Sequence, residues 1–119
     1  MKSEYSGMAR IWAAFKNSIR GLKVVFKNEQ AFRHDILLCA VGAFLMFALP
    51  FDLYERIVLG FSLVFILFAE LVNSAIESTV DRIGSEYHIL SKNAKDIGSA
   101  IVFISLIWAS ICWGVILLQ

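Results

Sequence analysis

The feature that most constrains this chain is a set of carboxylates inside a long apolar run. Residues 57–81, IVLGFSLVFILFAELVNSAIESTVD, contain Glu70, Asn73, Glu77 and Asp81 at helical spacing. At about 100° per residue, positions 77 and 81 lie within roughly 20° of position 70, so the polar groups form one stripe on a helix. A charged side chain near the bilayer centre costs roughly 2.5–3.5 kcal/mol, and a carboxylate there therefore indicates a functional site.

The composition is that of a membrane protein, and its long apolar runs predict an all-α fold. Of 119 residues, 59% are hydrophobic, and the mean hydropathy is +0.72. We expect one membrane domain over 1–119, with transmembrane helices at about 31–49, 57–76 and 97–118. The first span has only 14 uncharged residues, 36–49, so we expect it to include the residues just before them or to thin the bilayer. Both cysteines lie in apolar runs, and no disulfide is expected.

The first segment, about residues 8–28, has the pattern of a helix on the membrane surface. Apolar and aromatic residues recur on one helical face, and Lys16, Arg20, Lys23 and Lys27 follow the other. Such a helix is held at the headgroups by its apolar face and by attraction to anionic lipid. The alternative is a helix packed on a soluble partner, which the spanning segments directly after it disfavour.

The distribution of Lys and Arg predicts the orientation. Seven precede the first span, one (Arg56) lies in the turn marked by Pro50 and Asp52, three lie in the polar connector 78–96, and none follows the third span. The positive-inside rule places the N-terminus and the connector in the cytoplasm. Glu70 is then about 10 Å below the cytoplasmic boundary, at the depth of a lipid headgroup or glycerol. Gly84 is the expected break point in the connector.

Polar side chains should gather at this cytoplasmic face. Paired carboxylates without a His or Cys cluster favour a hard cation such as Mg²⁺, which shares its oxygen ligands with phosphates. Arg10 and Lys95 are then available for phosphate oxygens, and Glu70, withdrawn from water, is a candidate general base toward a hydroxyl. The candidates are Glu70, Asn73, Glu77, Asp81, Glu86, His88, Lys95, Asp96 and Ser99, with Arg10 and Glu29 from the N-terminal region.

The structural alternative is a stripe that joins membrane helices by hydrogen bonds. This structural alternative is reasonable for Asn73. It is disfavoured for Glu70 with Glu77, because two carboxylates one heptad apart repel unless a cation or proton intervenes. The chain has no GxxxxGK[ST] loop, no Gly-rich kinase loop, no HRD or DFG and no GxSxG. Nucleotide chemistry here would need another arrangement.

The run AELVNSAIESTVDRIGSEYHILSKNAKDIGSA, residues 69–100, resembles the signature region of the prokaryotic integral-membrane diacylglycerol kinases. NEQAFR at 28–33 and the three spans match that family as well. The resemblance implies ATP-dependent phosphorylation of the 3-hydroxyl of sn-1,2-diacylglycerol to phosphatidic acid at the bacterial inner membrane. It also implies a homotrimer whose active sites are shared between neighbouring subunits, in contact with membrane lipid and without a nucleic-acid partner.

The resemblance further implies residue roles, with Glu70 as general base and Glu29 and Glu77 as Mg²⁺ ligands. Asn17 stands where the family pattern has an aromatic contact to the nucleotide. The implied ATP positions are Arg10, Asn17, Glu29, Glu77, Glu86, Tyr87, His88, Lys95 and Asp96. The implied lipid positions are Arg10, Ala14, Phe15, Ser18, Ile19, Lys23, Ala31, Arg33, Asp35, Arg56, Glu70, Asn73, Ser99 and Trp113.

Two rival functions follow from the same residues. A related kinase that acts on undecaprenol shares the fold and much of the signature, although GSEYHILSKNAKDIGSA resembles the diacylglycerol branch more closely. The other rival is a non-enzymatic small membrane subunit, in which the polar stripe only holds helices together.

Overall fold

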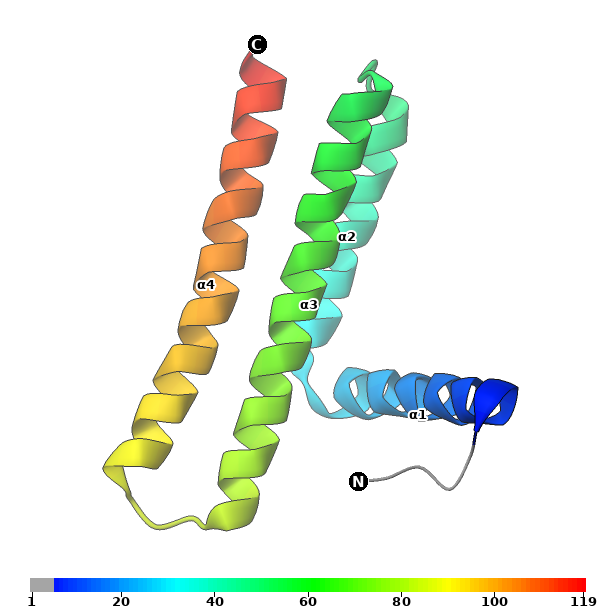
Figure 1. Ribbon diagram of the computed structural model, residues 1–119. Helices are drawn as coiled ribbons and strands as arrows, with labels where there is room; N and C mark the ends of the chain where they lie inside the picture. Colours follow the sequence, from blue (N-terminus) through cyan, green and yellow to red (C-terminus); the bar gives the residue numbers. More distant parts are fainter. Residues whose placement is uncertain (1–5) are drawn as a thin grey trace.

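The computed structural model describes residues 6–119, which form four α-helices (Figure 1). They are α1 (Gly7–Asn28), α2 (Gln30–Ala48), α3 (Leu53–Ile83) and α4 (Ile89–Leu118). The last three are long and apolar enough to cross a membrane. The expected all-α fold with three spans is confirmed. The short first span gains its length at its N-terminal side, because α2 already begins at Gln30.

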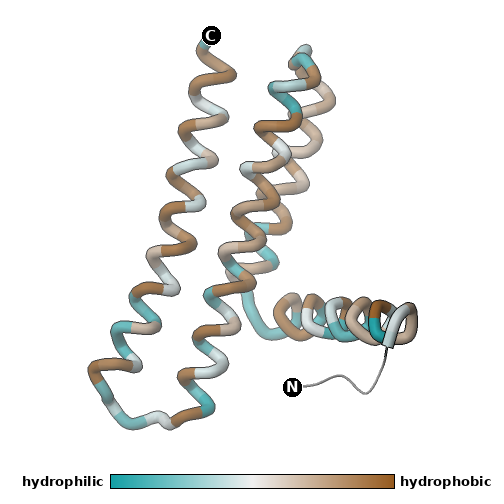
Figure 2. The backbone as a smooth tube through the Cα atoms, viewed as in Figure 1, coloured by the Kyte–Doolittle hydropathy of each residue, from teal (hydrophilic) through white to brown (hydrophobic). Residues whose placement is uncertain are grey.

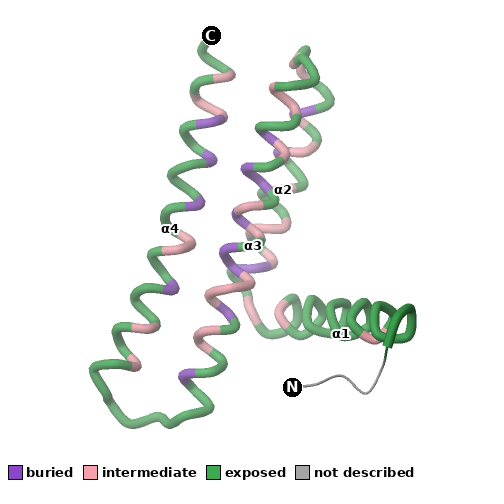
Figure 3. Tube along the Cα trace, viewed as in Figure 1, coloured by how far each residue is buried: buried purple, intermediate pink, exposed green. Residues whose placement is uncertain are grey.

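Helix α3 is the centre of the molecule. It packs against both α2 and α4, most extensively against α4, whereas α1 extends sideways from the start of α2 (Figure 1). In its most apolar stretch 39% of the residues are buried, compared with 11% in α2 and 17% in α4. The buried positions of α4 follow one side of that helix (Figure 3). The helix that carries the carboxylates is therefore the one with neighbours on both sides.

The start of α3 lies at Leu53 rather than at Ile57, where the sequence pattern placed it. The reason is a capping box. Asp52 Oδ1 accepts a hydrogen bond from the Glu55 N–H at 2.8 Å, and Glu55 Oε1 accepts one from the Asp52 N–H at 2.9 Å. Both groups satisfy backbone donors that a helix start would otherwise leave free. The D-x-x-E spacing was the sequence signal for this earlier start.

The segment 78–96, expected as a polar connector, is helical at both ends. Helix α3 continues to Ile83 and α4 begins at Ile89, which leaves 84–88 as the connection. Gly84 ends α3, as expected, and His88 caps α4 by accepting a hydrogen bond from the Leu90 N–H at its Nδ1 (3.1 Å). A helix of 31 residues spans about 46 Å, which is longer than the ~30 Å hydrocarbon core of a bilayer and leaves length for polar turns outside it.

The corner between α1 and α2 is stabilised by Arg33 of α2. Glu29 has extended backbone angles, and its N–H bonds to Val25 O at 2.8 Å. The Arg33 guanidinium donates to the carbonyls of Phe26 (2.6 Å) and Lys27 (3.0 Å), which lie in the last turn of α1. These bonds satisfy helix-end carbonyls that lack an intrahelical partner. These bonds fix the junction between α1 and α2, and with it the position of Glu29.

The outer surface of the three long helices is apolar. Hydrophobic residues continue along them, while hydrophilic residues gather at the connector and along α1 (Figure 2). The accessible surface is 9100 Å². A compact soluble monomer of this mass exposes about 6,500 Å². A single chain therefore leaves extensive apolar surface for lipid or for other copies to cover.

Candidate functional site

A groove beside the middle of α3 collects several of the predicted site residues. We call it the carboxylate groove. It has a volume of about 280 Å³ and is bounded by α3, the α1–α2 corner and α4. The predicted base, both predicted metal ligands and three predicted lipid contacts meet there, although they come from three parts of the chain. Its lining residues are Glu29, Ala31, Glu70, Asn73, Ser74, Glu77, Ser99, Val102, Phe103 and Leu106.

Glu70 is the most enclosed of these carboxylates, with 8% of its surface exposed. The Asp35 carboxyl group of α2 is its neighbour across the α2–α3 interface. Asp35 Oδ2 is buried and has no hydrogen-bond partner among residues 6–119. Two carboxyl groups at one low-dielectric interface are costly unless a proton or a cation lies between them. Packing alone therefore does not account for this arrangement.

One turn further along α3, Asn73 holds Glu77. The Asn73 side-chain amide donates from Nδ2 to Glu77 Oε1 at 3.0 Å. Asn73 Oδ1 is buried and lacks a hydrogen-bond partner within the described residues. The amide fixes one carboxylate oxygen, and the other carboxylate oxygen is available to a ligand.

The donors in the carboxylate groove suit a hard cation. Carboxylate and amide oxygens from Glu29, Glu70, Asn73 and Glu77 line it. Among residues 6–119, no three His, Cys, Asp or Glu side chains converge into a closed ligand cluster. Mg²⁺ commonly takes one or two carboxylates and completes its octahedron with water and substrate phosphates. The residues present therefore fit a shared Mg²⁺ site better than a closed structural site.

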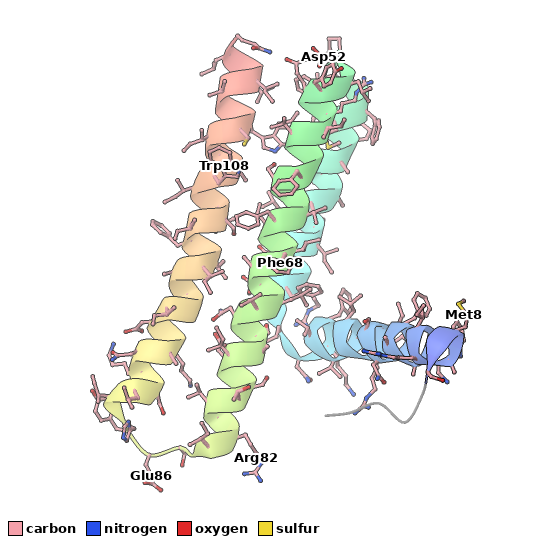
Figure 4. The ribbon with its side chains drawn as sticks, in the orientation of Figure 1. Met8, Asp52, Phe68, Arg82, Glu86 and Trp108 are labelled. Carbon is pink, nitrogen blue, oxygen red and sulfur yellow. The ribbon has the colours of Figure 1, made fainter. Side chains whose placement is uncertain are left out.

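A second groove lies at the connector, and we call it the connector groove. Its volume is about 590 Å³, and Figure 4 shows Glu86 at this end of the helices, with Asp52 at the other. Five predicted ATP positions meet here. The lining residues are Val80, Asp81, Gly84, Ser85, Glu86, Tyr87, His88, Ser91, Lys92, Lys95 and Asp96.

Two ion pairs line the connector groove, one between α4 and α3 and one within α4. Lys95 Nζ lies 2.7 Å from Asp81 Oδ1, and Lys92 Nζ lies 2.7 Å from Asp96 Oδ2. Lys95 also interacts electrostatically with Glu77, which lines the carboxylate groove. The two grooves are neighbours along α3, because Glu77 lines one and Asp81, one turn further, lines the other. Sequence reasoning did not include Lys92, although its three-residue spacing from Lys95 places both cations on one helical face.

A third groove of about 360 Å³ separates α1 from α3, and Asn17 and Glu29 line it. Since Glu29 lines this groove and the carboxylate groove, the two are neighbours. The other predicted contacts on α1 do not line the carboxylate groove of their own chain. These are Arg10, Ala14, Phe15, Ser18, Ile19 and Lys23.

Arg56 and Trp113 lie far from the carboxylates. Arg56 Nε donates to Met46 O at 2.9 Å, at the end of α2, and Trp113 Nε1 donates to Ser62 Oγ at 3.2 Å. Along α3, Arg56 and Glu70 are separated by about 21 Å, because each residue of a helix rises 1.5 Å. The structure thus does not bring these two predicted lipid contacts to the groove that holds Glu70.

Comparison with known proteins shows that the sequence is similar to one protein family over nearly its full length. A family described as prokaryotic diacylglycerol kinase matches residues 16–117. A diacylglycerol kinase of Haemophilus influenzae is 46% identical over 112 residues, covering 94% of this chain and 95% of that protein. One from Escherichia coli K12 is 41% identical over 117 residues (98% and 96%), and one from Pseudomonas aeruginosa is 42% identical over 113 (95% and 92%).

Proposed function

The chain belongs to the prokaryotic diacylglycerol kinase family, and from this membership we propose that it phosphorylates diacylglycerol with ATP. The products are phosphatidic acid and ADP. The observation that carries the proposal is the adjacency of two grooves, one lined by carboxylates at lipid depth and one lined by cations and polar residues at the connector. The two grooves meet on α3, where Glu77 lines the first and Asp81, one turn further, lines the second.

In this proposal Glu70 is the general base. Its carboxylate accepts the proton of the 3-hydroxyl while that oxygen attacks the γ-phosphorus, and the bond from the γ-phosphorus to the bridging oxygen of ADP breaks. Glu70 is nearly enclosed, so a lipid hydroxyl in the groove meets it in place of bulk water. Asn73 and Ser99 line the same groove and orient the hydroxyl. A positioned base contributes about 10²–10⁴-fold to such a reaction.

The nucleotide is held mainly from the connector. Glu86, Tyr87, His88 and Asp96 line the connector groove and contact the adenosine end of ATP. Lys95 and, from α1, Arg10 neutralise phosphate oxygens. Phosphoryl transfer depends chiefly on positioning and charge neutralisation, which a few such side chains supply.

Glu29 and Glu77 are the proposed Mg²⁺ ligands. When bound, Mg²⁺ neutralises phosphate charge and orients the transferred group. Asn73 keeps Glu77 in place through its hydrogen bond to Oε1. Glu29 is kept in place by the α1–α2 corner, which Arg33 stabilises.

We further propose that the chain sits in the bacterial inner membrane with its N-terminus and both grooves on the cytoplasmic side, where ATP is available. Helix α1 lies along the membrane surface, with its apolar face toward the acyl chains. The excess of Lys and Arg before the first span and in 78–96 supports this orientation.

A homotrimer with shared active sites completes the proposal. One chain leaves much apolar surface exposed, and Arg10, Phe15 and Ile19 on α1 do not line its own carboxylate groove. In an assembly, α1 of one subunit serves the carboxylate groove of its neighbour. The charged stripe is then enclosed by protein, as a membrane carboxylate requires.

The test is transfer of labelled phosphate from ATP to diacylglycerol and to undecaprenol in mixed micelles, with Glu70→Gln as the matched inactive control. We expect labelled phosphatidic acid from diacylglycerol and little product from undecaprenol. A preference for undecaprenol would reassign the substrate, and no transfer to either lipid would favour a non-enzymatic membrane subunit.

A further inference from the structure

Gly98 of α4 faces Asn73 in the polar stripe of α3. Gly98 is buried, and a methyl group in its place would overlap Asn73 Oδ1 and lie 3.4 Å from Asn73 Cγ. Ile76 Cδ1 is next, at 3.5 Å. The missing side chain at position 98 therefore provides the space that the Asn73 amide occupies.

The two ends of that amide have different surroundings. Nδ2 donates to Glu77 Oε1 at 3.0 Å, whereas Oδ1 lies against Gly98 and has no hydrogen-bond partner among residues 6–119. The amide group is planar and rigid, so a displacement of Oδ1 also moves Nδ2. Whatever displaces the oxygen end of Asn73 thus disturbs the bond to Glu77.

We propose that Gly98 is a positioning residue for phosphoryl transfer, which acts through Asn73 on Glu77. This inference rests on the proposed function, in which Glu77 is a cation ligand. Gly98 leaves room for the amide, the amide holds one oxygen of Glu77, and the carboxylate is aimed into the carboxylate groove. Loss of a group that orients a metal ligand typically costs about 10–100-fold in metal affinity or activity.

A second close glycine contact in the helix core, at Gly42, has a different character. A methyl group at Gly42 of α2 would meet the Leu63 side chain at 2.9 Å and the Trp113 ring at 3.4 Å, both of which are packing residues. Small residues of that kind let membrane helices approach. Gly98 instead faces a side chain that is hydrogen-bonded to a proposed ligand, so its replacement should affect cation binding as well as packing.

The experiment compares Gly98→Ala with Gly114→Ala in the full-length, assembled protein. Gly114 lies on the same helix, and a methyl group there meets nothing within 4 Å. Binding of Mn²⁺ with a non-hydrolysable ATP analogue, followed by electron paramagnetic resonance, reports cation affinity without turnover. We expect Gly98→Ala to weaken Mn²⁺ binding and raise half-saturating Mg²⁺ in the kinase assay by about 10-fold or more. Gly114→Ala should differ from the parent by less than about twofold in both.

A double-mutant cycle separates this role from general packing. If Gly98 acts through Asn73, adding Gly98→Ala to an Asn73→Ala background should change Mn²⁺ affinity by less than about twofold. The same loss in both backgrounds would overturn the proposal, as would unchanged Mn²⁺ affinity in Gly98→Ala. If Gly98→Ala does not assemble, the double variant should assemble, because replacing Asn73 with alanine frees the space beside position 98. A double variant that also fails to assemble would overturn the proposal.

Glu77→Gln distinguishes failure of this inference from failure of the proposed site. Weakened Mn²⁺ binding in Glu77→Gln together with normal binding in Gly98→Ala would reject the role of Gly98 alone. Normal Mn²⁺ binding in Glu77→Gln would reject the proposed ligand itself and, with it, the role of Gly98.

Discussion

Lys95 Nζ lies 2.7 Å from Asp81 Oδ1, and this ion pair joins α4 to α3 across the connector. The two side chains are 45% and 66% exposed. An ion pair so accessible to water contributes little to stability and is readily exchanged for another anion. Lys95 is therefore kept beside the connector groove while remaining available to a phosphate group.

Asp81→Asn should lower the KM for ATP by about two- to fivefold. The substitution releases Lys95 and removes a negative charge from a groove proposed to take a polyphosphate. Initial rates over an ATP titration measure the effect. Asp52→Asn is the matched control, because Asp52 lies at the opposite end of α3 and Asn caps a helix about as well as Asp. A higher KM would mean that Asp81 holds Lys95 in its productive position.

Glu70→Gln should reduce turnover by about 10²-fold or more, because glutamine keeps the shape of the side chain but cannot accept the proton. Binding of ATP and lipid should change much less, since the lost interaction belongs to the transition state. Thermal stability should hold or rise, because the enclosed carboxylate is a cost to the fold. Parallel measurements of kcat, KM and Tm suffice. Near-normal turnover in an intact assembly would remove Glu70 from the role of base.

Glu77→Gln should abolish most activity and raise the Mg²⁺ concentration needed for the remainder, while the fold stays intact. Replacing this carboxylate with an amide removes a hard oxygen ligand. Kinase rates over an Mg²⁺ titration measure the metal requirement of the variant and the parent, and a thermal melt checks that the fold is intact. A titration curve that coincides with the parent curve would show that Glu77 is not a ligand.

In detergent the protein should be a homotrimer, and light scattering on a sizing column measures its mass. If active sites are shared between subunits, two different inactive variants should complement each other. Arg10→Ala and Glu70→Gln chains, each nearly inactive alone, should regain activity when they are unfolded, mixed and reassembled, because some mixed sites then receive both native residues. An active, monodisperse monomer would contradict the assembly, and mixtures no more active than their parts would contradict site sharing.

The sequence predicted what depends on periodicity along one helix. Helical spacing put Glu70 and Glu77 on one stripe, and both line the same groove. Apolar run lengths predicted three spans, and Gly84 predicted where α3 ends. These features are local, because side-chain direction in a helix repeats with a fixed angle. The start of α3 was equally local, but its signal, the capping box of Asp52 and Glu55, was overlooked.

Only the tertiary structure decided which faces meet. Gly98 and Asn73 are on different helices, as are Lys95 and Asp81, and nothing in either helix's own pattern specifies the partner. The position of Trp113 beside Ser62 likewise follows from how α4 aligns with α3, whereas the distance between Arg56 and Glu70 was already determined by the rise along α3. Periodicity defines the direction of a side chain around its own axis. The packing of α3 between α2 and α4 determines what lies opposite, because close-packed helices admit few relative positions.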